Sequence, residues 1–225
     1  TFSDKLEDDV ARRDFTVNSI ALKPKSFNME KVECEVFDFF SGSEDIQKKI
    51  IKAVGDPKVR FEEDALRILR AIRLAVQLNF EIEENTLQAI KDQILSVDEV
   101  SKERVRDELI KILLKDNGNR GIQIMEEVGL LKVLLPELYE CIGVGQNKHH
   151  IYTVYEHCFR ALDYACVQGF SLEVRLASLL HDIGKPCVKE GEGKECTFYN
   201  HEVVGAKLTE KILKNSFQVL ILRIK

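Results

Sequence analysis

Residues Val59–Phe80 read VRFEEDALRILRAIRLAVQLNF. Apolar side chains recur there at steps of three and four residues, which predicts one amphipathic helix over the whole segment. Acidic residues open the segment, where they suit the positive end of a helix dipole. Its polar face carries a row of residues spaced three apart: Asp64, Arg67, Arg70 and Arg73.

Asp64 and Arg67 are about one helical turn apart, so the predicted helix places them side by side. A carboxylate supplies acceptors and a guanidinium supplies a rigid fork of donors, which together can read the edge of a nucleobase. Arg70 and Arg73 lie further along the helix, where they could meet phosphates. On this segment alone a second interpretation stays open, namely a solvated helix face with i,i+3 ion pairs.

The chain has 225 residues, of which 44% are hydrophobic and 32% charged, with a formal net charge of −5. This composition is typical of a soluble globular protein with one large domain or two to three small ones. The acidic balance gives no global attraction for RNA, so any RNA contact must come from local clusters of Lys and Arg. No apolar run is long enough to predict a membrane span. The six cysteines are scattered, which indicates reduced thiols in a cytoplasmic protein.

The remaining patterns predict a mainly α chain. Ser43 fits a helix N-cap, and Asn85 and Ser96 each begin a capping-box spacing. The expected elements are a strand over Val32–Phe40 and helices over Glu44–Ile51, from Asn85, from Ser96, over Ser101–Lys115, over Gly121–Leu135, over Ile151–Cys166, over Leu172–Leu180 and from His201.

All five histidines follow residue 148. His157 lies in a predicted helix, and the doublet His181–Asp182 follows another. Imidazole is the commonest metal ligand and a neighbouring carboxylate can share the ion, so these residues form a candidate metal site. The alternative, polar side chains that only hydrogen-bond inside a helical bundle, stays open. His149 and His150 are interpreted as linker surface.

Several motifs, in order along the chain, resemble one family, the bacterial-type (class II) tRNA nucleotidyltransferases or CCA-adding enzymes, together with their poly(A) polymerase relatives. The resemblance covers nearly all of the chain. The matching segments are Arg12–Ser19 with the "RRDFTxNA" signature, Phe37–Ile46 with "DPFGGxxDL" (Phe39 standing where Pro is usual), Glu63–Arg67 with the base-selecting "EDxxR" motif, Ser101–Leu109 with "ERxxxEL", Leu134–Leu138 with the end of the neck, and His157, His181–Asp182 and His201 with an HD domain.

The resemblance implies the remnant of an α/β palm over residues 1–55, an all-α neck over 56–140 that selects the nucleotide and binds tRNA, and an incomplete all-α HD domain over 141–225. It implies part of an enzyme that adds C and A from CTP and ATP to tRNA 3′ ends without a template. The implied nucleotide-binding residues are Arg13, Asp14, Asn18, Asp64, Arg67, Arg70 and Arg73. The implied metal ligands are His157, His181 and Asp182, with His201 as a further contact of that site.

The same resemblance implies Mg²⁺ for nucleotidyl transfer in the complete enzyme, a divalent metal at the HD site, and the tRNA acceptor end as partner. One departure changes the expectation. The family's catalytic carboxylates lie in a "GGxxRD…DxD" segment upstream of the RRDFT motif, and the sequence given contains no such segment. We therefore expect a fragment that cannot itself transfer nucleotides. The distal Asp that the resemblance implies for an HD site is also missing from the sequence given, so we expect metal binding to be weak or absent.

Three alternatives stay open. The first is a fragment of a poly(A) polymerase, against which the HD region argues. The second is a metal-dependent HD phosphohydrolase with an RNA-binding platform, which a loss of phosphatase activity on His181→Ala would favour. The third is an RNA-binding remnant without chemistry, which binding of CTP or ATP would exclude.

Overall fold

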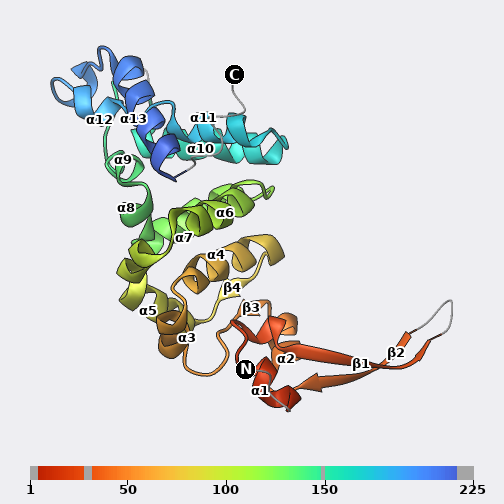
Figure 1. The fold of residues 1–225 in the computed structure, drawn as a ribbon. Helices are drawn as coiled ribbons and strands as arrows, with labels where there is room; N and C mark the ends of the chain where they lie inside the picture. Colours follow the sequence, from red (N-terminus) through yellow and green to blue (C-terminus); the bar gives the residue numbers. More distant parts are fainter. Residues whose placement is uncertain (1–4, 28–31, 148–149, 217–225) are drawn as a thin grey trace. The chain divides into compact units, whose positions relative to one another are not determined.

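The computed structural model describes residues 5–27, 32–147 and 150–216. Its contacts divide the chain into two compact units, Thr1–Ser96 and Val97–Lys225. This division differs from the three expected segments, because it falls inside the expected neck. Most described residues are helical (Figure 1), which confirms the mainly α prediction. No helix among the described residues is long and apolar enough to cross a membrane.

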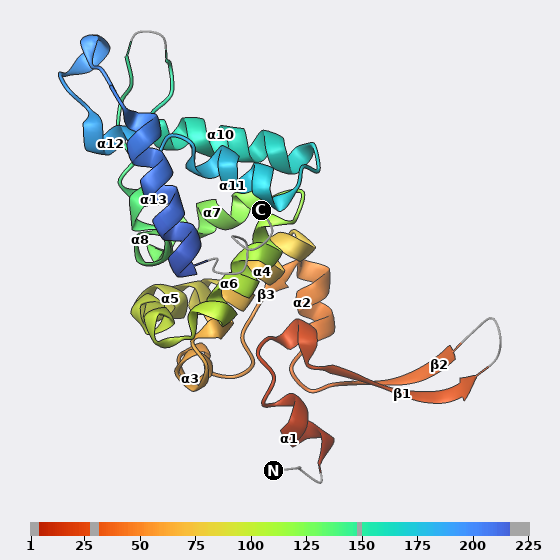
Figure 2. The same cartoon turned by 45° about the horizontal axis from the view of Figure 1, so that its top comes forward.

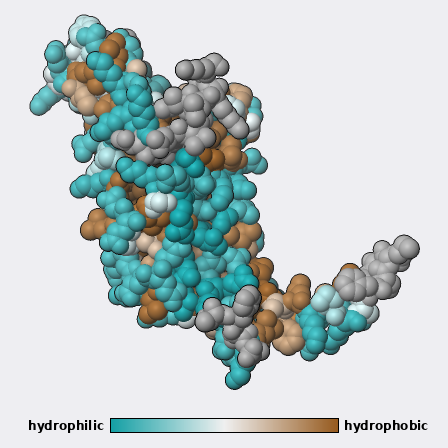
Figure 3. All heavy atoms as spheres, viewed as in Figure 1, coloured by the Kyte–Doolittle hydropathy of each residue, from teal (hydrophilic) through white to brown (hydrophobic). Residues whose placement is uncertain are grey.

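The first unit begins with α1 (Leu6–Val10), η1 (Thr16–Asn18) and an antiparallel ribbon of β1 (Ile20–Phe27) and β2 (Val32–Asp38). The predicted strand over Val32–Phe40 therefore exists and ends two residues early. The ribbon extends away from the helices of its own unit in both views (Figures 1 and 2). Leu22 and Val36 face each other across it and are 62% and 56% exposed. Figure 3 shows both hydrophobic and hydrophilic surface in this part of the molecule.

Next come α2 (Gly42–Lys48) and the short β3 (Ile50–Ile51). The expected helix over Glu44–Ile51 is shifted, and Ser43 is not its cap. Instead Asp38 accepts the N–H groups of Gly42 and Ser43, both at 2.8 Å. Burial alone would raise the pKa of Asp38, but these N–H groups lower it below its ordinary value. Gly42 has no room for a side chain, since a Cβ there would lie 2.2 Å from the carbonyl oxygen of Thr16.

The single helix predicted over Val59–Phe80 is wrong, because the chain forms α3 (Pro57–Glu63) and α4 (Leu66–Leu78) with a break between them. At the break Asp64 has extended backbone, with φ −158° and ψ 101°. Its side chain accepts the N–H of Leu66 at 3.1 Å. A short acidic side chain can thus replace a helical hydrogen bond with its own, which is why Asp favours helix starts. α4 opens with the N–H of Arg67 donating to the carbonyl of Asp64 at 3.0 Å.

The unit closes with β4 (Glu81–Ile82), which pairs in parallel with β3, and α5 (Glu84–Gln93). The predicted cap Asn85 is wrong by two residues. Glu83 holds that position and accepts the N–H of Thr86 at 2.8 Å. Among the described residues, the largest fully buried side chains of the unit are Phe15, Ile51, Phe61, Ile68, Leu69, Ile72 and Ile90.

The chain enters the second unit through η2 (Ile94–Glu99), followed by α6 (Lys102–Leu113), α7 (Gly118–Glu127), α8 (Leu130–Leu134) and α9 (Pro136–Tyr139). Ser96 therefore starts no α-helix. The helix expected over Gly121–Leu135 is divided, because Gly129 has φ 84° between α7 and α8. Only glycine adopts such a conformation without steric cost.

The rest of the unit is α10 (Val154–Val167), α11 (Leu172–Leu180), α12 (Lys185–Val188), η3 (Gly193–Glu195) and α13 (His201–Ser216). α10 starts at a capping box of Thr153 and Glu156 and lies beside α11 in Figures 1 and 2. Arg175 on α11 is buried and donates to the carbonyls of Leu113, the last residue of α6, and of Lys115, both at 2.6 Å. This guanidinium therefore fixes α11 against α6.

Candidate nucleotide cleft and histidine cluster

A cleft of about 440 Å³ lies in the first unit, between the segment that precedes β1 and the α3–α4 junction. We call it the arginine cleft, because four guanidiniums and two carboxylates line it. Its lining residues are Arg12, Arg13, Asp14, Asn18, Asp64, Arg67 and Arg70. The excess of positive charge suits an anionic ligand.

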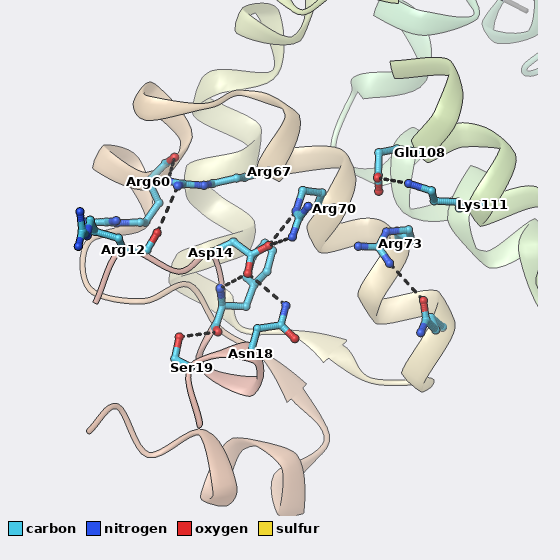
Figure 4. A network of polar contacts seen from close by, with 12 residues as sticks. Arg12, Asp14, Asn18, Ser19, Arg60, Arg67, Arg70, Arg73, Glu108 and Lys111 are labelled. Carbon is cyan, nitrogen blue, oxygen red and sulfur yellow. Dashed lines mark hydrogen bonds and ion pairs between the residues drawn. The ribbon is translucent and has the colours of Figure 1, made fainter. Parts of the chain in front are cut away.

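Asp14 fixes one wall of the cleft (Figure 4). It is 7% exposed, and one carboxylate oxygen accepts the N–H of Phe15 at 2.9 Å and the amide of Asn18 at 3.1 Å. The other oxygen accepts from Nε of Arg70 at 2.8 Å and also from Nη2 of that residue. A carboxylate that accepts two donors of one guanidinium is held firmly. Asp14 therefore joins the N-terminal segment to α4.

Arg67 is held on the opposite wall. Its Nη1 donates to Glu63 Oε2 at 2.5 Å and to the carbonyl of Arg60 at 2.8 Å, and its Nη2 reaches the carbonyl of Arg12 at 3.4 Å. These bonds use three of the five N–H groups of the guanidinium. Within the described part of the chain, its other two N–H groups are not engaged. Arg67 is thus anchored and still has donors for a ligand.

The cleft brings together six of the seven residues predicted to bind nucleotide. Arg73 is the exception, since it is not part of the lining and donates to Gln77 on the exposed side of α4 at 3.2 Å. Sequence reasoning missed Arg12 as a lining residue, although the RRDFT motif contains it. It also missed Glu63 and Arg60 as contacts of Arg67, for which the i,i+4 spacing of Glu63 was an available signal.

The second unit holds a cluster of histidines around Asp182, which is 4% exposed. The Nε2 atoms of His157 and His181 lie 3.7 and 3.3 Å from Asp182 Oδ2, and Nε2 of His201 lies 3.6 Å from Oδ1. The structure therefore brings together all three predicted metal ligands and the predicted additional contact. His150, interpreted as linker surface, has its ring centroid 6.0 Å from that of His157.

The cluster also contains a buried cation that the sequence prediction missed. Lys185 Nζ donates to Asp182 Oδ2 at 2.6 Å and to the side-chain oxygen of Gln146 at 2.7 Å. Lys185 and Gln146 are 7% and 8% exposed. The only sequence signal was the i,i+3 spacing of Lys185 from Asp182. The contact with Gln146 joins residues 39 positions apart and has no local signal.

The contacts within the cluster shift the pKa values of its histidines and of Asp182. His181 Nδ1 lies 3.0 Å from the carbonyl of Ser178 while Nε2 faces Asp182, so both ring nitrogens face oxygen. The hydrogen bond with Asp182 raises the pKa of His181. Burial, and then the neighbouring His181, lower the pKa of His157. Burial alone would raise the pKa of Asp182, but hydrogen bonds from His181 and Lys185 hold it well below its usual range.

The donor set fits a divalent cation. Ligand atoms of His157, His181 and Asp182 all lie within 4.8 Å of one another. Nδ1 of His181 and of His201 each contacts a main-chain carbonyl, an arrangement that fixes the Nε2 lone pair for a metal. A cation would replace the Nε2 proton that otherwise bridges His181 to Asp182.

Comparisons with known proteins find related segments along the chain. Three family models match: the poly A polymerase head domain over residues 1–52, the probable RNA and SrmB-binding site of polymerase A over 79–141, and the HD domain over 154–223. Together they span most of the sequence in the expected order.

Named relatives point to the same family. The A-adding tRNA nucleotidyltransferase of Deinococcus radiodurans is 36% identical over 218 residues, covering 92% of this chain and 48% of that protein. The CCA-adding enzyme of Pediococcus pentosaceus is 45% identical over 125 residues, covering 56% of this chain and 30% of that protein. The first of these matches thus spans about half the length of the relative.

Among solved structures, the CCA-adding enzyme of Bacillus stearothermophilus in complex with CTP is similar, with a TM-score of 0.61 and 27% identity over 94% of this chain and 46% of that one. This likeness confirms the fold predicted from the sequence. The chain therefore matches the family of poly(A) polymerases and tRNA nucleotidyltransferases over segments of the head, the RNA-binding region and an HD domain.

Proposed function

We propose that this chain is the nucleotide-selecting, RNA-binding and HD part of a tRNA nucleotidyltransferase that adds C and A from CTP and ATP to tRNA 3′ ends. In this proposal residues 1–55 belong to the head, 56–140 to the neck that meets the tRNA acceptor end, and 141–225 to the HD domain. Mg²⁺ would serve nucleotidyl transfer in the complete enzyme. The named relatives and the contents of the arginine cleft support the assignment.

The observation that carries the proposal is the presence of Asp64 and Arg67 in one positively charged cleft. Cytosine and adenine share a pattern on their pairing edges, an exocyclic amino donor beside a ring-nitrogen acceptor. Uracil and guanine present the opposite pattern, a carbonyl acceptor beside a ring N–H. A carboxylate that accepts and a guanidinium that donates therefore match C and A and leave U and G with unpaired polar groups.

The other lining residues suit the rest of a nucleoside triphosphate. Arg13 and Arg70 offer guanidiniums for phosphate oxygens. Asp14 restrains Arg70, and Asn18 restrains Asp14. Arg73 is proposed only as a distant phosphate contact, because it lies outside the cleft lining.

Titration with CTP, ATP, UTP and GTP tests this function. Arg67→Ala should weaken CTP and ATP binding by about 5- to 150-fold, since one good bidentate contact to a base contributes about 1–3 kcal/mol of discrimination. Lys58→Ala is the control, because Lys58 is exposed on α3 and pairs with Asp92. Equal binding of all four nucleotides by the wild-type chain would contradict the proposal. Arg73→Ala should weaken all four nucleotides equally if it contributes to phosphate binding.

A second candidate function, metal-dependent phosphohydrolysis, is favoured by the histidine cluster. His157, His181 and Asp182 would hold the cation, which would polarise a phosphate ester and lower the pKa of a bound water. Lys185 places a buried positive charge beside that position, suited to a phosphate oxygen. Titration with Mn²⁺ or Ni²⁺ should give saturable binding that His181→Ala removes. Binding unchanged in His181→Ala would exclude this site.

A further inference from the structure

Arg60, on α3, has a side chain without an evident structural task. Its side chain is 17% exposed, and its Nε and Nη1 are buried without a hydrogen-bond partner in the described structure. Burying a hydrogen-bond donor without a partner destabilises the fold. Among the described residues its ion-pair partner is Glu63, whose Oε2 lies 3.1 Å from Arg60 Nη1, an ion-pair distance without hydrogen-bond direction.

Glu63 is shared. The same Oε2 accepts from Nη1 of Arg67 at 2.5 Å, so one carboxylate lies between two guanidiniums. Arg67 Nη1 also donates to the main-chain carbonyl of Arg60 at 2.8 Å. Arg60 therefore contacts the proposed base-reading guanidinium in two ways, directly through its backbone and indirectly through Glu63.

Because Arg60 and Arg67 share the Glu63 carboxylate, Arg60 affects the net charge and the orientation of the Arg67 guanidinium. Two guanidiniums and one carboxylate carry a net positive charge, so Glu63 cannot neutralise Arg67 fully. Arg60 also restrains the Glu63 carboxylate, which in turn fixes the direction of Arg67. Without the Arg60 charge, Glu63 would pair with Arg67 alone, and the guanidinium would be both less positive and less constrained.

We propose that Arg60 is a positioning residue for nucleotide selection, acting through Glu63 on Arg67. This inference rests on the proposed function of the arginine cleft. Arg60 lines no part of that cleft, so its effect is on the orientation and charge of Arg67 and not on contact with the nucleotide.

The test is a double-mutant cycle in the full chain, with CTP and UTP titrated separately. Arg60→Met keeps the length of the side chain and removes its charge, and it should reduce the preference for CTP over UTP by about 5- to 10-fold. Glu63→Gln should reduce it similarly. If Arg60 acts through Glu63, the double variant should lose no more than Glu63→Gln alone. Additive losses, or an unchanged preference in Arg60→Met, would overturn the proposal.

Two further variants separate positioning from folding. Arg60→Lys retains the charge and should recover part of the CTP preference, and it remains informative if Arg60→Met does not fold. Lys58→Met, on the exposed face of the same helix, should leave the preference unchanged. A wild-type chain with no CTP preference would refute the proposed function together with this inference. A preference that Arg67→Ala removes and Arg60→Met leaves intact would refute this inference alone.

Discussion

The contact between Asp14 and Arg70 allows a quantitative prediction for Asp14→Asn. The carboxylate is buried, with one oxygen facing two N–H groups of Arg70 and the other facing the Phe15 N–H and the Asn18 amide. Asparagine has nearly the same shape but only one acceptor oxygen. If that oxygen keeps the contacts of Phe15 and Asn18, its NH₂ group faces the donors of Arg70.

The magnitude follows from the bonds lost. Removing one partner of a fully buried ion pair costs about 3–5 kcal/mol. The Arg70 side chain is 37% exposed, so water can solvate part of the guanidinium once Asp14 is replaced. Asparagine also retains the two neutral bonds. We therefore expect Asp14→Asn to lower the free energy of unfolding by about 2–3 kcal/mol, below the buried-pair range.

Urea unfolding followed by circular dichroism measures this change. Asp9→Asn is the matched control, since Asp9 and Arg13 are 3.4 Å apart and both 56% exposed. Exposed pairs contribute about 0–1 kcal/mol, so the control should be nearly silent. The midpoint should fall while the slope with urea is unchanged. If Asp14→Asn cost no more than Asp9→Asn, the buried contact would not be what joins the N-terminal segment to α4.

Three more predictions follow from single contacts. Arg175→Met should lower the free energy of unfolding by about 3–5 kcal/mol, because the buried guanidinium donates to the main-chain carbonyls of Phe170, Leu113 and Lys115. A decrease of less than about 1 kcal/mol, measured by urea unfolding, would contradict this. Gly184→Ala should prevent the close approach of α12 to α13 and lower the midpoint temperature of thermal unfolding, since a Cβ at this position would lie 2.2 Å from the carbonyl oxygen of His201 in α13. An unchanged midpoint temperature would refute this prediction. At pH 8 a thiol reagent should label the exposed Cys34 and Cys187 quickly, whereas burial raises the pKa of Cys158 to about 12 and keeps it protonated and slow; rapid labelling of all six cysteines in the folded protein would be the contrary result.

How far the sequence predicted the fold depended on how local each signal was. Leu172–Leu180 was predicted at its observed bounds, because a largely apolar segment there lies between Ser171 and the polar doublet His181–Asp182. The β1 strand was not predicted. It contains Pro24 and two lysines, and it is a strand because it pairs with β2, which no local propensity records.

In the candidate site too, the sequence predicted the residues that lie in local motifs and missed those that meet only in the fold. Five of the six predicted nucleotide-binding residues in the cleft came from two contiguous motifs, and Arg70 follows the second motif by three residues, so placing those segments on one cleft placed the residues. Gln146 and Lys185 meet only through tertiary packing, and no spacing in the sequence connects them. The parts of the site that the sequence did not predict are thus those that depend on contacts between distant segments.

The error over Val59–Phe80 bears most directly on the site. In one continuous helix Asp64 would lie on a smooth polar face, and the C-terminal end of α3 would not exist. The break creates that end, and Arg67 donates to the carbonyl of Arg60 in the last turn of α3. A guanidinium there also meets the negative end of the helix dipole. The acidic residue that interrupts the helix therefore also creates the place where Arg67, the proposed base-reading residue, is held, so the site requires the irregularity that helical periodicity alone could not predict.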